Sequence, residues 1–420
     1  MRLRNPQVKL LLENFISLSV LKFLDLTLPL ILTPFIIYRI GVVNFGIYGF
    51  ALSLITYMRN FVQYGFTLSA VRDIAIQNEN KEKINLIINR VLSVKIFMAF
   101  CMFAILIFLL SVFPKFGEYK TLYLFSFFFV VGDIMDLSWY FQGIQKMKLI
   151  TFFNVISKST FAIFVFTLLK NREDYVLLPL YQFLGILISS IFGFYYLIKI
   201  SQIKIRLVGI YQIFLEIKIG FSTFITLFLP TLYSNTSTFL LGFFGDPTSV
   251  AYFVGGSRIA DVFISFNTIL TQVFYPFLNK MKSKFLIISK IIIVSGLVST
   301  LVMLVTSKIT VALILGSEMS KSVYIVWILS LSPLLMSLRT AFGVNKLLVN
   351  YKDTLYMKIA FISSISGLIA VTLLILKFNY IGAAFGIVFA QFIFAFLSYR
   401  YSQYFVINVD NYLKIKEISV

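Results

Sequence analysis

The sequence predicts an all-α integral membrane protein with about twelve transmembrane helices in two six-helix bundles. Composition is the first observation: the 420 residues are 59% hydrophobic and only 13% charged, whereas a soluble domain carries about 25% charged residues. The second observation is that long apolar stretches recur along the whole chain. The third is that the connections between them are too short for a separate soluble domain.

Each expected span is a stretch of about 20 mostly apolar residues, the length that crosses a bilayer as a helix. The spans cover residues 15–38, 46–70, 91–113, 121–142, 150–169, 175–198, 219–243, 249–277, 285–306, 323–345, 356–376 and 381–405. Lys and Arg predict their orientation: with the N-terminus inside, the inner loops and tails hold about three times as many as the outer loops. Both termini are therefore expected in the cytoplasm.

A weak internal repeat with a period of about 200 residues predicts the division into two bundles. The matches pair Gly143 with Gly343, Gly41 with Gly245, and Pro29 with Pro230. Residues 1–205 and 206–420 are the expected bundles, related by a pseudo-two-fold axis along the membrane normal. The alternative is chance similarity between glycine-containing loop ends.

Several classes of function are excluded by what the sequence lacks. There is no histidine and only one cysteine, Cys101, so we expect no metal site and no disulfide. No Walker A motif and no nucleophile–base pair occurs, so an enzyme is not expected, and no cofactor is implied. The net charge of +20 does not indicate nucleic-acid binding, because the basic residues are spread over short loops.

Charged residues inside the expected spans are the candidates for function. Each costs roughly 2.5–3.5 kcal/mol at the bilayer centre, so a chain tolerates them where they face a polar cavity or a partner. The bases are Lys22, Arg59, Lys158, Arg258 and Arg339, and the acids are Asp25, Asp133, Asp136 and Asp261. The excess of bases indicates a path for an anion, and the acids are candidates for coupling to a cation.

All four acids have a second interpretation from their spacing. Asp25 lies three residues after Lys22, so the two are neighbours on one helix face and either form a functional acid–base pair or neutralise each other. Arg258 and Asp261 repeat this spacing, and there neutralisation is favoured. Asp133, with Asp136 and Tyr140, falls on one face of a continuous helix, where two close carboxylates raise one another's proton affinity or pair with bases of a neighbouring helix.

Three of the bases have no acid at helical spacing. Lys158 and Arg339 lie in the cytoplasmic half of their spans, where a long side chain either lines a cavity or reaches the headgroups. Arg59 lies near mid-span, which favours the cavity. A guanidinium in a cavity of low dielectric constant binds phosphate oxygens bidentately.

At the end of the fourth span, Asp136-Leu-Ser-Trp139-Tyr-Phe-Gln142-Gly143-Ile-Gln-Lys146 resembles a motif of the bacterial polysaccharide-transport proteins. These are the O-antigen (Wzx-type) flippases of the multidrug/oligosaccharidyl-lipid/polysaccharide exporter superfamily. The segment from Leu28 to Phe50 is similar to that family's first loop. One departure is that this chain has no acid in Asn235-Thr-Ser-Thr238, where family members often carry one, so we expect no cation coupling there.

The resemblance implies that Trp139, Gln142, Gly143 and Lys146 are family-motif residues. It also implies the substrate, an O-antigen or capsule repeat unit on polyprenyl pyrophosphate, moved from the inner to the outer leaflet of the bacterial cytoplasmic membrane by alternating access. The implied partners are an H+ or Na+ gradient, the bilayer and a glycan polymerase of the same pathway. The alternatives are a multidrug or cation antiporter of the same superfamily and, from another class, a membrane glycan polymerase.

Overall fold

Helices make up the regular structure of this protein wherever the chain is described. The computed structural model describes residues 6–77, 80–280, 285–350 and 352–404, and no strand occurs within these ranges. The chain divides into two compact units, Met1–Phe228 and Leu229–Val420.

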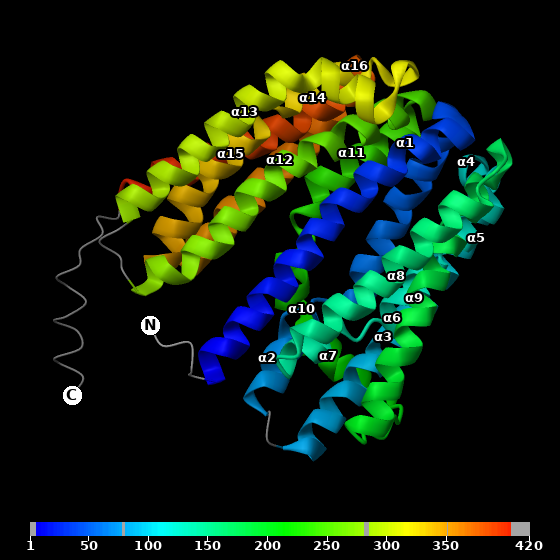
Figure 1. Cartoon of the computed structure of the whole chain (residues 1–420), viewed down its shortest axis with the longest axis vertical. Helices are drawn as coiled ribbons and strands as arrows, with labels where there is room; N and C mark the ends of the chain where they lie inside the picture. Colours follow the sequence, from blue (N-terminus) through cyan, green and yellow to red (C-terminus); the bar gives the residue numbers. More distant parts are fainter. Residues whose placement is uncertain (1–5, 78–79, 281–284, 351, 405–420) are drawn as a thin grey trace. The chain divides into compact units, whose positions relative to one another are not determined.

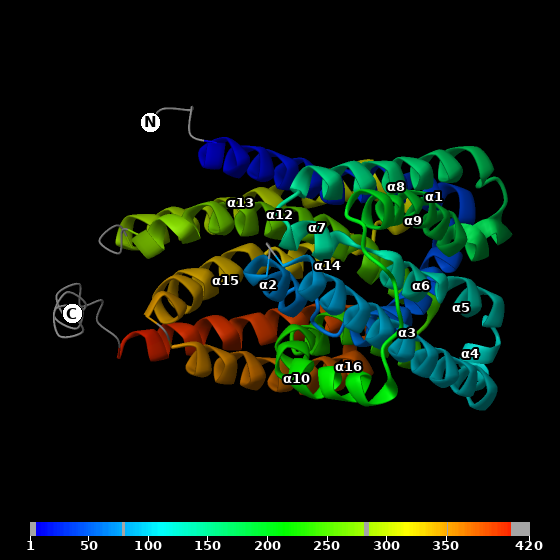
Figure 2. The same ribbon diagram turned by 90° about the horizontal axis from the view of Figure 1, so that it is seen from below.

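The first unit runs from the blue to the green end of the colour scale in Figure 1. Its helices are α1 (Pro6–Gln63), α2 (Ser69–Ile76), α3 (Lys81–Val112), α4 (Pro114–Gly117), α5 (Lys120–Ser126), α6 (Phe128–Met135), α7 (Ser138–Gly143), α8 (Met147–Leu168), α9 (Leu178–Tyr195) and α10 (Ile210–Phe228). A 3-10 turn, Arg172–Leu177, precedes α9, and a π-helical turn, Tyr196–Ile200, follows it. Helix α8 packs beside α9 and α1, as both ribbon views show (Figures 1 and 2).

The second unit is also entirely helical over its described residues. Its helices are α11 (Thr231–Phe244), α12 (Pro247–Lys280), α13 (Phe285–Leu315), α14 (Ser322–Leu329), α15 (Ser332–Arg339) and α16 (Asp353–Ser402). A π-helical segment, Thr340–Leu347, continues directly from α15. Helix α13 packs against α12 and α15, and α11 packs against α16.

Two of the longest helices each contain two expected spans. Helix α1 breaks at Gly41, where φ is 80° and ψ is 164°, and α16 breaks at Asn379, where φ is 51° and ψ is −131°. Glycine adopts a positive φ without steric cost, and asparagine tolerates it better than most other residues. Over the described residues, nine helices are long and apolar enough to cross a membrane, with α1 and α16 counted once each.

The seventh expected span, 219–243, is two helices instead of one. Helix α10 ends at Phe228 and α11 begins at Thr231, with Pro230 at the junction. Pro230 has no backbone N–H to donate, so a helix does not continue through it without losing a hydrogen bond. The boundary between the compact units lies here, after residue 228, whereas the sequence placed the bundle boundary after residue 205.

An extended segment before α10 explains why the first unit continues past residue 205. Along α3, Asn85, Asn89 and Ser93 stand one helical turn apart, and their side chains bond the backbone of alternate residues 204, 206 and 208. The Lys204 and Arg206 amides donate to Asn85 and Asn89 at 3.2 and 3.0 Å, and the Val208 amide donates to Ser93 at 3.0 Å. Asn89 also donates to the Lys204 carbonyl at 3.0 Å.

Aromatic packing then fixes α10 to the same unit. The rings of Tyr64 and Phe224 stack with centroids 4.8 Å apart, and Phe61 lies 5.2 Å from Phe224. Such pairs contribute about 0.5–1.5 kcal/mol each beyond the area they bury. Residues 206–228 are therefore part of the first unit.

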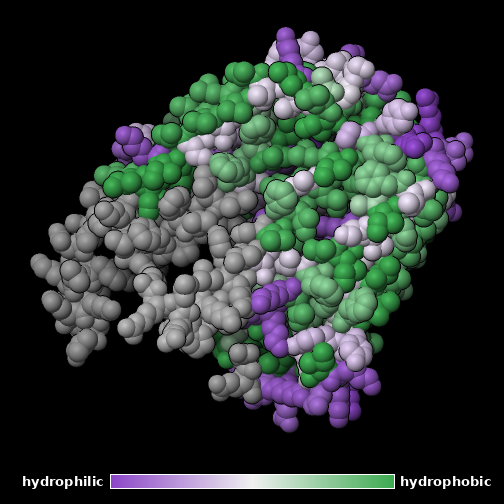
Figure 3. Space-filling model, in the orientation of Figure 1, coloured by the Kyte–Doolittle hydropathy of each residue, from purple (hydrophilic) through white to green (hydrophobic). Residues whose placement is uncertain are grey.

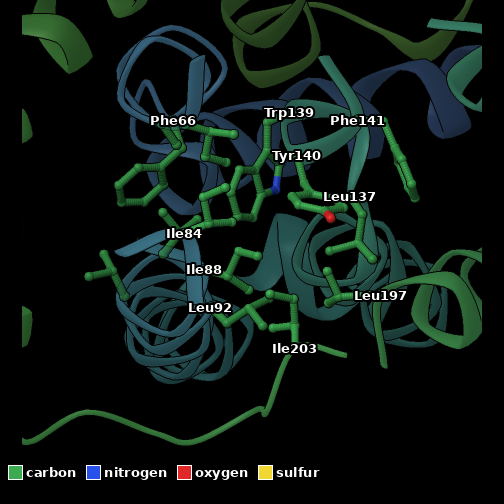
Figure 4. Close-up of a cluster of buried hydrophobic side chains, with 14 of the residues drawn as sticks. Phe66, Ile84, Ile88, Leu92, Leu137, Trp139, Tyr140, Phe141, Leu197 and Ile203 are labelled. Carbon is green, nitrogen blue, oxygen red and sulfur yellow. The ribbon is translucent and has the colours of Figure 1, made fainter. Parts of the chain in front are cut away.

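The core of the first unit gathers around α7. Figure 4 shows Ile84, Ile88 and Leu92 of α3 facing Trp139 and Tyr140 of α7, with all five buried. The outer surface is rich in apolar side chains, unlike that of a soluble protein. On the face drawn in Figure 3, apolar side chains cover the flanks of the helices, while hydrophilic residues gather near helix ends.

Candidate functional site

The candidate site forms around a break in the fourth span. Helix α6 ends at Met135, Asp136 has an extended backbone with ψ 114°, and α7 begins at Ser138. The continuous helical face predicted for Asp133, Asp136 and Tyr140 is therefore wrong, since the break turns the residues after Asp133 away from that register. Tyr140 instead donates to the Ser201 hydroxyl at 2.8 Å.

Two buried side chains satisfy the carbonyls that this break releases. The Lys95 ammonium of α3 donates to the Asp133 carbonyl at 2.8 Å, and the Trp139 indole donates to the Asp136 carbonyl at 3.0 Å. Lys95 is only 3% exposed. A cation is favoured there because the carbonyls at a helix C-terminus carry partial negative charge.

The Asp136 carboxylate is occupied by the start of α7. Its Oδ1 accepts the Ser138 amide at 2.9 Å and the Ser138 hydroxyl at 2.5 Å. Asp136 lies one residue before Leu137, the N-cap residue of α7, so its carboxylate forms an Asx turn at the entry to this helix. The predicted role of Asp136 in cation coupling is not tested by this geometry, but the side chain already has a structural task.

Asp133 is held by the mid-span arginine. The Arg59 Nε and Nη2 donate to Asp133 Oδ2 and Oδ1 at 2.7 and 2.9 Å, and the Gln63 amide donates to Oδ1 at 3.2 Å. The Asp133 side chain is 6% exposed and that of Arg59 is 36% exposed. The Phe129 ring lies 5.7 Å from the guanidinium carbon.

Asp25 pairs across helices. Its carboxylate accepts the ammonium of Lys158 in α8, so its ion pair is with a base of another helix, and Lys22, three residues away in α1, is exposed. Pairing between spans neutralises both charges and joins α1 to α8. Arg258 and Asp261 lie three residues apart on α12, and Asp261 is exposed.

Arg339 has a different environment in the second unit. Its Nε and Nη2 donate to the Tyr356 hydroxyl at 3.2 and 3.0 Å, and its guanidinium carbon lies 4.0 Å from the centre of the Phe394 ring. Tyr233 of α11 lies near enough to Arg339 to interact with it electrostatically. Over the described residues no carboxylate forms an ion pair with Arg339, so its charge is balanced by hydroxyls and aromatic rings.

The family-motif residues divide between packing and surface. Trp139 is 2% exposed, and a Cβ on Gly143 would lie 2.7 Å from Cγ2 of Ile74 in α2, so this glycine permits α7 and α2 to meet. Gln142 and Lys146 are exposed. The Lys146 ammonium donates to the Tyr196 hydroxyl and lies 5.2 Å from the centre of that ring.

The sequence did not single out Lys95, Gln63 or Tyr356 as candidates. Lys95 had a signal, since it falls four residues inside the expected span 91–113, but a lysine so near the cytoplasmic end of a span is typical of the loop bases. Gln63 also had a weak signal, being one helical turn after Arg59. Tyr356 had none, because a tyrosine near a span end is typical of any membrane helix.

Comparison with known proteins places this chain among transport-related membrane proteins. A profile of the family described as "Polysaccharide biosynthesis protein" matches residues 11–282. A protein of Escherichia coli (strain K12) described as "Putative O-antigen transporter" is 28% identical over 382 residues, which is 89% of this chain and 92% of the relative. A protein of the same description from Shigella dysenteriae is 23% identical, covering 90% and 96% of the two chains.

Solved structures share the fold at lower identity. The lipid II flippase MurJ in its inward closed conformation superposes with a TM-score of 0.73 at 17% identity, covering 92% of this chain and 87% of MurJ. An inward-facing multidrug resistance MATE family transporter of the MOP superfamily gives 0.69 at 13% identity, covering 93% and 97%. The predicted fold class, an all-α membrane protein with the fold of these transporters, is confirmed.

Proposed function

This chain belongs to the polysaccharide biosynthesis protein family, and we propose that it moves an oligosaccharide linked to polyprenyl pyrophosphate across the bilayer. The predicted resemblance to this family is confirmed, and membership agrees with the prediction of a transporter instead of an enzyme. The protein is a multi-pass membrane protein. The direction of movement that we propose is from the inner to the outer leaflet of the bacterial cytoplasmic membrane, with both termini in the cytoplasm.

The observation that supports this substrate most directly is the environment of Arg59. A guanidinium that is partly exposed inside a span, with donors still available, is suited to a phosphate oxygen. The lipid chain of such a substrate stays in the bilayer while its pyrophosphate and sugars need a polar path. Lys22, Lys158, Arg258 and Arg339 are the other basic residues that we assign to this path.

Alternating access is the mechanism that we propose for the two units. Motion of one bundle against the other opens a central site first to one side and then to the other. We assign the moving bodies to residues 1–228 and 229–420, because the segment 201–209 is bonded to α3. This assignment replaces the boundary after residue 205.

Coupling to an H+ or Na+ gradient is part of the proposal, and the intramembrane acids differ in their suitability. The Asp136 carboxylate accepts the amide and hydroxyl of Ser138, and the Asp133 carboxylate accepts from Arg59 and Gln63. Asp25 and Asp261 are the better candidates, since both are exposed; Asp25 pairs with Lys158, and Arg258 lies three residues before Asp261. The ion pair between Asp25 and Lys158 also joins α1 to α8.

The experiment that tests this function uses the full chain reconstituted in liposomes with a fluorescent oligosaccharide on a short polyprenyl pyrophosphate. We expect wild-type protein to bring the labelled sugar to the outside, where a membrane-impermeant quencher reaches it. Arg59→Ala should slow this transfer at least about tenfold, because hydrogen bonds to a charged group contribute about 1.5–3 kcal/mol.

The matched control is Arg72→Ala, an exposed arginine of α2 that pairs with the neighbouring Asp73. It should transfer the lipid as wild type does. Transfer of a cationic drug with no transfer of the glycolipid would overturn the proposal and favour the antiporter alternative.

A further inference from the structure

We propose that Asp133 is a positioning residue that orients Arg59, so that the outer edge of the guanidinium, Nη1 with Nη2, binds one phosphate group of the substrate. This inference rests on the proposed function and deepens it. It also assigns Asp133 a task other than cation coupling.

Some N–H groups of the Arg59 guanidinium bond to Asp133, and the others remain available to a ligand. Asp133 accepts from Nε and Nη2, which is one side edge of the planar guanidinium. Of the five N–H donors of an arginine, this leaves both on Nη1 and one on Nη2. Over the described residues these three have no protein acceptor, and Arg59 keeps 36% of its side chain exposed. A phosphate matches this second edge with two parallel hydrogen bonds.

Hydrogen bonds hold both the carboxylate and the backbone carbonyl of Asp133. It stands in the last turn of α6, and the buried Lys95 holds its carbonyl at 2.8 Å. Gln63, one turn after Arg59 in α1, donates to the same Oδ1 that accepts Nη2. A carboxylate held in this way sets the plane of its arginine, which reduces the ordering that substrate binding must supply.

The hydrogen bonds around Asp133 occupy the oxygens that a coupling cation would need. Arg59 and Lys95 face two acids, Asp133 and Asp136, so the formal charges of this cluster balance. A sodium ion or proton arriving at Asp133 would displace Arg59 from its carboxylate. The three available donors of Arg59 instead suit a phosphate, which accepts two parallel hydrogen bonds from them.

The decisive test is Asp133→Asn, because positioning and simple charge predict opposite signs. Removing a negative charge beside Arg59 would strengthen anion binding if Asp133 only opposed the anion. If Asp133 orients the guanidinium, its loss weakens binding, since the amide offers a donor where an acceptor is needed. We expect farnesyl pyrophosphate to bind the variant about tenfold more weakly.

The measurement is titration of farnesyl pyrophosphate, with sulfate as the competing anion, into the full chain in lipid nanodiscs at fixed pH. Tighter or unchanged binding by Asp133→Asn overturns the inference. So does wild-type affinity combined with loss of ion-driven uptake in liposomes, since that result would make Asp133 the coupling acid.

A second variant guards against misfolding of the first. Arg59→Lys keeps the ion pair with Asp133 and the charge, but an ammonium offers no second planar edge. We expect it to fold and to lose affinity for pyrophosphate by about tenfold, with a parallel loss for sulfate, whose oxygens use the same edge of the guanidinium. Retained pyrophosphate affinity in Arg59→Lys overturns the inference, because a point charge would then suffice.

Arg72→Lys, at the exposed pair of α2, is the control and should leave every value unchanged. The outcomes also separate this inference from the proposed function. If wild-type protein binds no farnesyl pyrophosphate and transfers no glycolipid, the proposed function is wrong. If wild-type protein does both, and Asp133→Asn and Arg59→Lys have the same affinity as wild type, the positioning role alone is wrong.

Discussion

The fourth and tenth spans end in similar sequences but are built around opposite charges. Gly143-Ile-Gln-Lys146 follows α7, and Gly343-Val-Asn-Lys346 lies in the π-helical segment after α15. Before the first glycine the span carries Asp133 and Asp136; before the second it carries Arg339, at the place that Trp139 has in the fourth span. The glycine and the lysine are shared, whereas the intramembrane charges are not.

The two spans also stabilise a buried charge with different kinds of partner. Asp133 is balanced by Arg59, a full opposite charge at 2.7 Å. Arg339 is stabilised by the Tyr356 hydroxyl and the Phe394 ring, which are neutral. A neutral partner loses less when its charge is removed, so the comparison predicts that the fourth span is much more sensitive to single substitutions.

The largest expected effect is on stability at the fourth span. Asp133→Ala leaves Arg59 without its counterion, and loss of one partner of a buried pair costs about 3–5 kcal/mol; the partial exposure of Arg59 favours the lower end. Arg339→Met should cost only about 1–2 kcal/mol, since a cation–π contact and two hydrogen bonds to a neutral group are lost. Thermal unfolding midpoints in one detergent compare the two variants.

The control for that comparison is the double variant Arg59→Met with Asp133→Ala. It removes both charges and should recover much of the stability, because replacing a whole buried pair by apolar groups is often neutral. If the double variant loses as much stability as Asp133→Ala and Arg59→Met lose when their separate effects are added, the ion pair is not the source of the difference.

The second prediction concerns the two glycines. A Cβ on Gly143 would lie 2.7 Å from Ile74, and one on Gly343 would lie 2.8 Å from the Tyr356 ring. Either alanine overpacks its site and should cost about 1–3 kcal/mol. Gly343→Ala should also reduce glycolipid transfer beyond its loss of stability, because Tyr356 holds Arg339. Equal transfer per folded molecule in the two variants would show that Tyr356 has no such role.

The third prediction, with a smaller effect, is that Tyr140 contributes to stability whereas Tyr356 contributes to transfer. Tyr140→Phe removes a hydrogen bond to Ser201 and should lower stability by about 1 kcal/mol without changing transfer. Tyr356→Phe removes the acceptor of two guanidinium donors and should change transfer more than stability. Transfer assays normalised to folded protein distinguish them, and Phe394→Leu, which removes the ring from Arg339, should resemble Tyr356→Phe.

The smallest effect is a pH dependence at the linker between α11 and α12. Burial by itself would raise the pKa of Asp246, but hydrogen bonds from the Ser249 hydroxyl and amide and from Asn379 lower the pKa below its usual value. The resulting stability is present above the unfolded-state pKa of about 3.9 and is lost as pH falls through the folded-state pKa.

Asp246→Asn should therefore lower the unfolding midpoint at pH 7, by the equivalent of about 1 kcal/mol or less, and should have little effect near pH 3. The matching linker in the first unit, at Gly41, has no acid beside the glycine. Gly41→Ala should cost about 1 kcal/mol at both pH values, because the backbone strain at φ 80° does not titrate.

Prediction from the sequence worked where the signal was local. Apolar length gave the helical membrane class, and Gly41 marked a junction between two spans, as its positive φ shows. It failed at Asp136, where the expected continuous helix breaks. Apolar residues surround the two acids between Phe129 and Asp136, so the local pattern favours a continuous helix there. The break depends on hydrogen bonds that Lys95, Ser138 and Trp139 donate to Asp133 and Asp136.

The sequence by itself determined which residues carry charge inside spans, because the apolar length around Arg59, Asp133 or Arg339 is a property of neighbours in the chain. The tertiary structure alone decided their partners. Asp25 pairs with Lys158, on another helix, and Asp133 with Arg59, more than seventy residues away. In a bilayer a buried charge must find the nearest compensating group, and helix packing, not spacing along the chain, brings that group within a few ångströms.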